Sequence, residues 1–329
     1  MKFRFWCIGL FIVLAVVSFF SLTFQLDTPL QTAQQIIGNY DGSSKEQVIL
    51  VSRIARVCVA LLAGASLALS GLLMQLHYHN SLADPSLMGV TDGAALAVMV
   101  VLSFWPESTI FMRICASILG SFIAYGLIRI ALTQLPGDKS AVTLPLVGLI
   151  LSMILSSITT LLASYFGLAQ SLTSWYNSRL YRVEWSDVRY FIFPLFISLL
   201  ITFALRKQFN VYRHHPEVTI AIGMNRKVYA LILQLLVVVL TGVTVGIIGR
   251  VAFVGLIVPH MARLIFHNRY EKLILIVPLM GATFVVAADY FSRWVNYPFE
   301  TPIGIVFAMI GVPVFLWLIR KEKGHGYEV

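Results

Sequence analysis

The chain has 329 residues, of which 58% are hydrophobic and only 12% are charged, and its formal net charge is +9. Soluble domains carry about 25% charged residues, so this composition and a mean hydropathy of +0.84 exclude a soluble enzyme, a nucleic-acid-binding module and a disordered chain. The sequence predicts an all-α, polytopic membrane protein whose basic residues lie in short loops that orient it in the bilayer.

Apolar stretches of spanning length follow one another along the whole chain. A transmembrane helix needs about 20 apolar residues, and about ten such stretches are present. The first, at residues 5–25, has no small-residue cleavage site after it, so we expect a retained span rather than a signal peptide. The others fall at about 57–76, 86–105, 109–132, 141–166, 190–205, 228–249, 251–266, 273–292 and 303–319.

The distribution of lysine and arginine sets the expected orientation. An even number of spans returns the C-terminus, with its basic Arg320-Lys321-Glu322-Lys323 run, to the side of the N-terminus. Cytoplasmic loops carry the excess of positive charge. We therefore predict that both termini are cytoplasmic, in the cell membrane.

The stretch at 86–105 is the weakest of the predicted spans. Gly89 and Asp92-Gly93 interrupt its start, and a carboxylate is costly in hydrocarbon. The side chain of Asp92 could instead cap a helix that begins at Gly93. We expect a broken or short helix there.

The connector at 206–227 lies on the predicted cytoplasmic side and is rich in basic residues. Pro216 suits the start of a helix, Glu217 favours its first turn, and Gly223 can end it. The sequence predicts a short helix at the membrane surface. A basic loop that faces anionic lipid is the alternative.

Three stretches together carry a family resemblance. The first is Arg53-Ile-Ala-Arg56, followed by Leu61 to Gln75, Asn80-Ser-Leu-Ala-Asp-Pro85 and Leu87-Met-Gly-Val90. The second is Gly249 to Arg263, with Phe253-Val-Gly-Leu-Ile-Val-Pro-His260 at its centre. The third joins Gly281-Ala282, Ala288-Asp289 and Arg293 to Glu300-Thr-Pro-Ile-Gly-Ile-Val306 and Gly311-Val-Pro313. From about residue 45 to 320 the chain resembles the FecCD-type permeases, the membrane subunits of ATP-driven (ABC) importers of iron–siderophores, haem and cobalamin.

The resemblance implies one permease domain over residues 1–329 and a set of partners in a prokaryotic cell membrane. These are a second permease subunit, identical or paralogous, a cytosolic ABC ATPase dimer, an extracytoplasmic substrate-binding protein and membrane lipid, with no nucleic acid. The chain itself has no phosphate-binding GxxxxGK[ST] motif, so ATP hydrolysis belongs to a partner and the chain is not an enzyme.

The resemblance also assigns site residues. Arg53, Arg56 and Arg293, all on the outer side, match positions that dock the binding protein; snorkelling to lipid head groups is the alternative. Glu217, Gly223, Asn225 and Arg226 match the segment that contacts the ATPase. Asn80 and Leu82 match the inner gate of the translocation path, although a simple helix-ending turn would also explain them.

Iron–siderophore complexes are the expected cargo by family frequency, with haem or cobalamin as alternatives. An ion-coupled secondary transporter is a rival function, but it should carry carboxylates at the bilayer midplane. No catalytic residue, metal site or cofactor is predicted, since no HExxH motif is present and Cys7, Cys58 and Cys115 lack CxxC spacing.

Overall fold

The computed structural model describes residues 2–24, 32, 34, 45–134, 143–176, 180–267, 269–297 and 299–324. Within these ranges the chain forms helices and no strand. The long helices are α1 (Lys2–Thr23), α3 (Lys45–Tyr78), α5 (Ile110–Gln134), α6 (Thr143–Tyr165), α8 (Trp185–Ala204), α11 (Arg226–Ile248), α13 (Tyr270–Trp294) and α14 (Ile303–Gly324). The shorter elements are α4 (Val90–Phe104), α7 (Ala169–Tyr176), the 3₁₀ turn η1 (Leu180–Arg182), α9 (Arg206–Tyr212), α10 (Pro216–Ala221) and α12 (Val254–Phe266).

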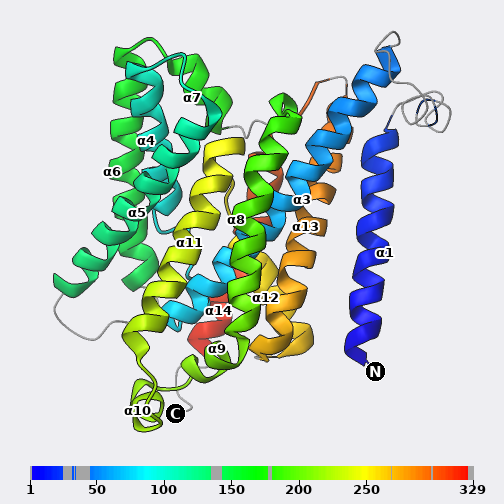
Figure 1. Ribbon diagram of the computed structural model, residues 1–329. Coiled ribbons are helices and arrows are strands. Elements are labelled where there is room, and N and C mark those ends of the chain that lie inside the picture. Colours follow the sequence, from blue (N-terminus) through cyan, green and yellow to red (C-terminus); the bar gives the residue numbers. More distant parts are fainter. Residues whose placement is uncertain are drawn as a thin grey trace.

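Each predicted apolar stretch overlaps a helix, although those at 86–105 and 251–266 begin a few residues before theirs. Seven described helices, α1, α3, α5, α6, α8, α11 and α13, are long and apolar enough to cross a membrane. Three shorter apolar helices, α4, α12 and the apolar part of α14, account for the remaining predicted stretches. The prediction of an all-α, polytopic membrane protein is confirmed, and both ends of the chain lie at the same end of the bundle (Figure 1).

Helix α3 forms the core of the bundle. It packs along α13, α11, α12 and α8, whereas α4, α5 and α6 gather on one side and α1 lies against α3 and α13 on the other (Figure 1). Glycines allow the closest approaches, because a Cβ added to Gly64 would overlap the carbonyl oxygen of Gly281, and one added to Gly71 would overlap Gly255. Small residues at crossings let helices in lipid approach closely.

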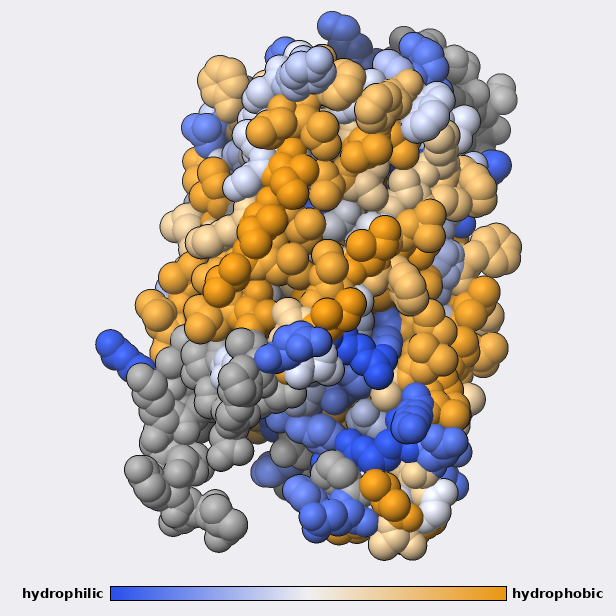
Figure 2. Space-filling view, turned by 90° about the vertical axis from the view of Figure 1, so that its left-hand side faces the viewer, coloured by the Kyte–Doolittle hydropathy of each residue, from blue (hydrophilic) through white to orange (hydrophobic). Residues whose placement is uncertain are grey.

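The outer surface of the bundle matches a lipid environment. Figure 2 shows an apolar belt on the side of α6, α5 and α4, above a hydrophilic lower end. Exposed side chains such as Leu119, Phe122 and Ile123 on α5 belong to the apolar surface of the bundle. Contact of these apolar side chains with lipid tails has no free-energy cost, whereas their exposure to water would be unfavourable.

Two non-helical segments lie within the depth of the helices. Residues 79–89 connect α3 to α4, and Gly89, at φ 76°, packs against Gly148 and Ser152 in the interior of α6. Residues 249–253 connect α11 to α12, and the Phe253 side chain packs on Gly311 of α14. Irregular backbone is tolerated at this depth only where protein or a water-filled cavity surrounds it. The two segments are therefore candidates for the moving or substrate-facing parts of the protein.

Candidate functional site

The three predicted outer arginines lie together at the end of the bundle opposite to both termini. Arg53 and Arg56 project from α3, and Arg293 projects from the last turn of α13. A cavity of about 330 Å³ opens beside them. It is lined by Phe24, Ser52, Arg53, Arg56, Leu180, Val183, Arg293, Tyr297, Phe299 and Glu300. The structure thus brings together three residues that the sequence only placed on one side.

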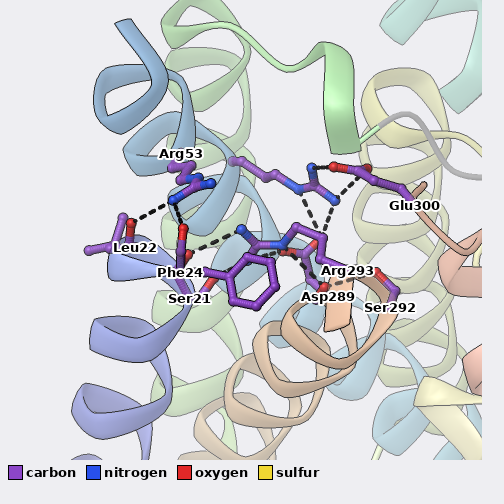
Figure 3. Close-up of polar contacts among 9 residues, drawn as sticks. Ser21, Leu22, Phe24, Arg53, Asp289, Ser292, Arg293 and Glu300 are labelled. Atoms are coloured by element: carbon purple, nitrogen blue, oxygen red, sulfur yellow. Dashed lines mark hydrogen bonds and ion pairs between the residues drawn. The ribbon is translucent and has the colours of Figure 1, made fainter. Parts of the chain in front are cut away.

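Two of these arginines, Arg56 and Arg293, form ion pairs with carboxylates of the same chain (Figure 3). Arg56 Nη2 lies 2.8 Å from Asp289 Oδ1, and Arg56 Nη1 lies 2.7 Å from Glu300 Oε1. Arg293 Nη2 lies 3.0 Å from Asp289 Oδ2. Asp289 is 1% exposed, whereas the Glu300 side chain is 44% exposed. Asp289 is the buried anchor of the network, and Glu300 is its solvent-facing arm.

The network also fixes the end of α1. Arg293, only 5% exposed, donates hydrogen bonds to the carbonyl oxygen of Ser21 at 3.1 Å and to the Ser21 hydroxyl. Arg53 donates to the carbonyl oxygens of Leu22 and Phe24. Because the last carbonyls of a helix have no partner within the helix, these arginines satisfy groups that would otherwise be left unpaired. Arg53 and Arg293 therefore join α1 to α3 and α13.

Asn80 and Leu82 lie in a buried turn. The Asn80 side-chain oxygen accepts a hydrogen bond from the Leu82 backbone at 2.9 Å, and the two residues are 8% and 1% exposed. Leu82 packs with Leu256 of α12. A few residues further on, the Ser86 hydroxyl accepts from the backbone N–H of Phe253 at 3.3 Å. The turn after α3 is thus tied to the start of α12.

Asp92 does not cap a helix that begins at Gly93. Helix α4 begins at Val90, and Asp92, fully buried in its first turn, forms an ion pair with Arg250 at 2.7 Å and accepts a hydrogen bond from the Ser152 hydroxyl. The prediction was wrong because Gly89, in a left-handed conformation, starts the helix earlier. Arg250, from the segment between α11 and α12, provides the compensating charge that sequence spacing did not indicate.

The segment at 206–227 folds into two short helices at the lower tip of the molecule (Figure 1). Pro216 stands in the first turn of α10 and Gly223, at φ 79°, follows its end, so the predicted short helix is confirmed. Apolar side chains of α10 and of the residue after it are exposed, with Val218, Ile220 and Ile222 between 53% and 64% exposed. The Glu217 side chain is 89% exposed.

Gly223 and Asn225 lie beside α10 in a groove of about 520 Å³. The groove is lined by Lys207, Gln208, Val211, Ile222, Gly223, Met224, Asn225, Val228 and Tyr229. Arg226, by contrast, contacts the rest of its own segment, where it donates to the carbonyl oxygens of Tyr212 and His214 and to the Thr219 hydroxyl. Of the predicted coupling residues, Glu217, Gly223 and Asn225 lie at the surface and Arg226 lies behind them.

Comparison with known proteins agrees with this architecture. The model of the FecCD transport family matches residues 10–321. The iron-uptake system permease protein FeuB of Bacillus subtilis is 36% identical over 86% of this chain and 85% of its own length. The iron(3+)-hydroxamate import system permease protein FhuB of the same organism is 33% identical, over 90% of this chain and 78% of its own. The iron(3+) dicitrate transport system permease protein FecC of Escherichia coli is 32% identical over 84% of each chain.

A solved structure of a metal-chelate type ABC transporter in an inward-facing conformation has the same fold. It superimposes with a TM-score of 0.79 at 27% sequence identity, and the match covers 97% of this chain and 99% of that one. The family match spans nearly all of the described helices. The chain is a multi-pass membrane protein that belongs to the FecCD transport family.

Proposed function

We propose that the chain is the permease subunit of an ATP-driven importer of ferric chelates of the siderophore or citrate type. The observation that carries this proposal is the family match over residues 10–321, together with relatives at 32–36% identity that are named as permeases for iron uptake, iron(3+)-hydroxamate and iron(3+) dicitrate. The two non-helical segments at membrane depth support a path at the place where they meet.

A cytosolic ATPase dimer is the proposed energy source, and α10 is its proposed contact. Val218 and Ile220 of α10 and Ile222, the residue after it, are exposed apolar side chains. Figure 2 shows apolar surface at the lower end that is separated from the apolar belt by hydrophilic surface. Exposed apolar side chains beyond the lipid belt mark an interaction site. Glu217, Gly223 and Asn225 surround this apolar face, and Arg226 braces it from behind.

An extracytoplasmic binding protein is the proposed partner of the outer cavity. Arg53 and Arg56 line the cavity, and Arg293 holds Asp289, which in turn holds Arg56. Glu300 accepts hydrogen bonds from both Nη atoms of Arg56, so a carboxylate of the binding protein would exchange with it. Such exchange replaces one carboxylate partner of Arg56 by another, so the arginine keeps a compensating charge. The arginines then serve the register and the rate of docking more than its strength.

Asn80 and Leu82 are the proposed inner gate. The turn that they form is buried against α12 and shares a hydrogen bond with the segment before that helix. A second copy of the permease, or a paralogue, would complete the path on its other side. Opening would require Leu82 to leave Leu256 while the Asn80 turn stays intact.

Purification of the intact complex tests the proposal. The tagged chain, extracted in mild detergent from cells grown without added iron, should carry an ATPase dimer, a second permease and a bound or captured ferric chelate, all measurable by mass spectrometry of the intact assembly. An ATPase partner with haem or cobalamin in place of a ferric chelate would correct the cargo alone. A chain that purifies with no ATPase would contradict the proposed energy source.

A further inference from the structure

The end of α3 is joined by a direct polar contact to residues 206–227, the proposed coupling segment. His79, the residue directly before Asn80, follows the last residue of α3. Its Nε2 atom lies 2.9 Å from Nη2 of Arg226, the first residue of α11. A guanidinium only donates hydrogen bonds, so the His79 nitrogen accepts and its imidazole is neutral.

The same arginine holds the coupling segment together. Its Nη1 atom lies 3.2 Å from the carbonyl oxygen of Tyr212, 3.3 Å from that of His214 and 2.9 Å from the hydroxyl of Thr219, which belongs to α10. One guanidinium therefore contacts the end of α9, the interior of α10 and the end of α3. A planar group with five fixed donors holds its partners in one relative geometry.

Tyr212 packs against both His79 and Arg226, and these three residues are called the joint below. The ring of His79 stacks on the ring of Tyr212, with centroids 5.7 Å apart and planes within 13°. The Arg226 guanidinium carbon lies 4.3 Å from the centroid of the same tyrosine ring. Tyr212 is 3% exposed, so its position is fixed by the bundle. The joint has little freedom to absorb movement by rearranging its own side chains.

Movement at His79 passes directly into the proposed gate turn. His79 has a left-handed backbone with φ 49°, which is unfavourable for a residue with a side chain. The next backbone N–H, of Asn80, donates to the carbonyl oxygen of Gln75, and the Asn80 side chain holds Leu82. The arginine contact and the turn are therefore adjacent in the chain.

We propose that Arg226 and His79 are positioning residues that transmit the movement of α10 to the inner gate turn at Asn80–Leu82. This inference rests on the proposed function and adds the route by which the coupling segment reaches the gate. Neither residue needs to touch the cargo or the ATPase for this role.

The test uses the complete complex in lipid nanodiscs and proteoliposomes with His79→Ala, His79→Gln and, as a matched control, His267→Ala. His267 is an exposed histidine at the same end of the bundle and also has a left-handed backbone, with φ 55°. Loss of the His79–Arg226 contact should leave ATP hydrolysis near the wild-type rate. It should lower the amount of cargo moved per ATP by about 2- to 30-fold, the range by which mutations within a coupling network change the coupling. Glutamine keeps an acceptor for Arg226 and should restore most of the ratio.

A second readout follows the gate itself. A hydrophilic maleimide is reacted with the Ser81→Cys variant, in a background in which the three native cysteines are replaced by serine, with and without ATP. The rate of the maleimide reaction should change with ATP when position 79 is histidine or glutamine. It should not respond to ATP in His79→Ala.

Three results would each overturn the inference. They are an unchanged transport-to-hydrolysis ratio in His79→Ala, a fall of both activities in step, and a full ATP response of the thiol introduced at position 81 when the link is cut. Absence of ATP-driven transport in the wild-type complex would instead refute the proposed function.

Discussion

At the scale of single residues, Asp289 holds the charged residues of the outer end of the bundle together. Two largely buried arginines share this one buried carboxylate, and Glu300 completes the charge balance from the surface. Desolvating a charge is expensive unless a partner compensates it. The stability of this end should therefore depend on Asp289 far more than on Glu300.

Asp289→Asn should lower the free energy of unfolding by about 3–5 kcal/mol, because it leaves Arg56 and Arg293 without their shared buried anion. Glu300→Gln, the matched change at the exposed arm, should cost only about 0–1 kcal/mol. Thermal unfolding of the two variants in the same detergent measures the difference. Equal losses would show that Asp289 is not the anchor.

The pH response of the joint depends on His79. Burial lowers the pKa of His79 below its ordinary 6.5, and the positive charge of Arg226 lowers it further. Arg213, whose carbonyl group accepts from the imidazole, opposes this, and His215 and His77 also face the site. A base with a lowered pKa binds fewer protons in the intact joint, so the contact is fully present above pH 6.5 and weakens as the pH falls below it.

Cargo moved per ATP should accordingly fall in the wild-type complex as the pH drops through the lowered pKa of His79, which lies below 6.5, since a protonated His79 can no longer accept from Arg226. The His79→Gln variant has no titrating group at this position and should show a flatter profile. Paired measurements of uptake and hydrolysis across this range give the ratio. Identical pH profiles for the wild-type complex and His79→Gln would show that a group other than His79 titrates.

The sequence predicted none of these contacts, although its spacing is compatible with some of them. The spacing of Arg53 and Arg56, three residues apart, placed them on one helix face, and Asp289 stands four residues before Arg293, a spacing that permits the observed pair. The contacts of Arg56 with Glu300 and of Arg226 with His79 join residues that are far apart in the chain. Only tertiary packing brings such residues together.

At the scale of elements, close helix crossings replace the hydrophobic effect that drives soluble folding. Helices α3 and α13 meet at Gly64 and Gly281 with no space for a side chain. In lipid this contact is stabilised by van der Waals packing. The crossing should consequently be the part of the fold that is most sensitive to a single methyl group.

Gly64→Ala should destabilise the permease by about 1–3 kcal/mol, because the added methyl group forces α3 away from the Gly281 backbone. Gly126→Ala in α5, where nothing lies within 4 Å of an added Cβ, is the control and should be neutral or slightly stabilising through helix propensity. Folded yield and thermal stability after purification report both effects. A Gly64→Ala protein as stable as the control would mean that the crossing is looser than described.

Helix existence was easier to predict than helix ends. Apolar windows of about 20 residues identify a span whatever its neighbours are, so each predicted stretch overlaps a helix. The short helices α4 and α12 begin directly after Gly89 and Phe253, whose left-handed backbone conformation interrupts the helical geometry. The partner of Asp92 was missed for the same reason, because Arg250 comes from a non-helical segment.

At the scale of the whole molecule, the bundle has one end that carries both termini and α10 and another that carries the arginine cavity (Figure 1). The orientation by positive charge predicts that the first end is cytoplasmic. A membrane-impermeant maleimide should react with Ile220→Cys only from the inside of cells or vesicles, and with Glu107→Cys in the α4–α5 loop only from the outside. Reaction of both positions from one side would overturn the topology.

The central claim is that ATP hydrolysis on a partner drives a ferric chelate through this permease. Uptake of radiolabelled ferric siderophore into proteoliposomes that contain the permease, its ATPase and its binding protein tests this most directly. The account predicts accumulation only when ATP is present on the side of α10, and none when the ATPase carries an inactivating substitution in its phosphate-binding loop. Accumulation driven by an ion gradient without ATP would contradict the account.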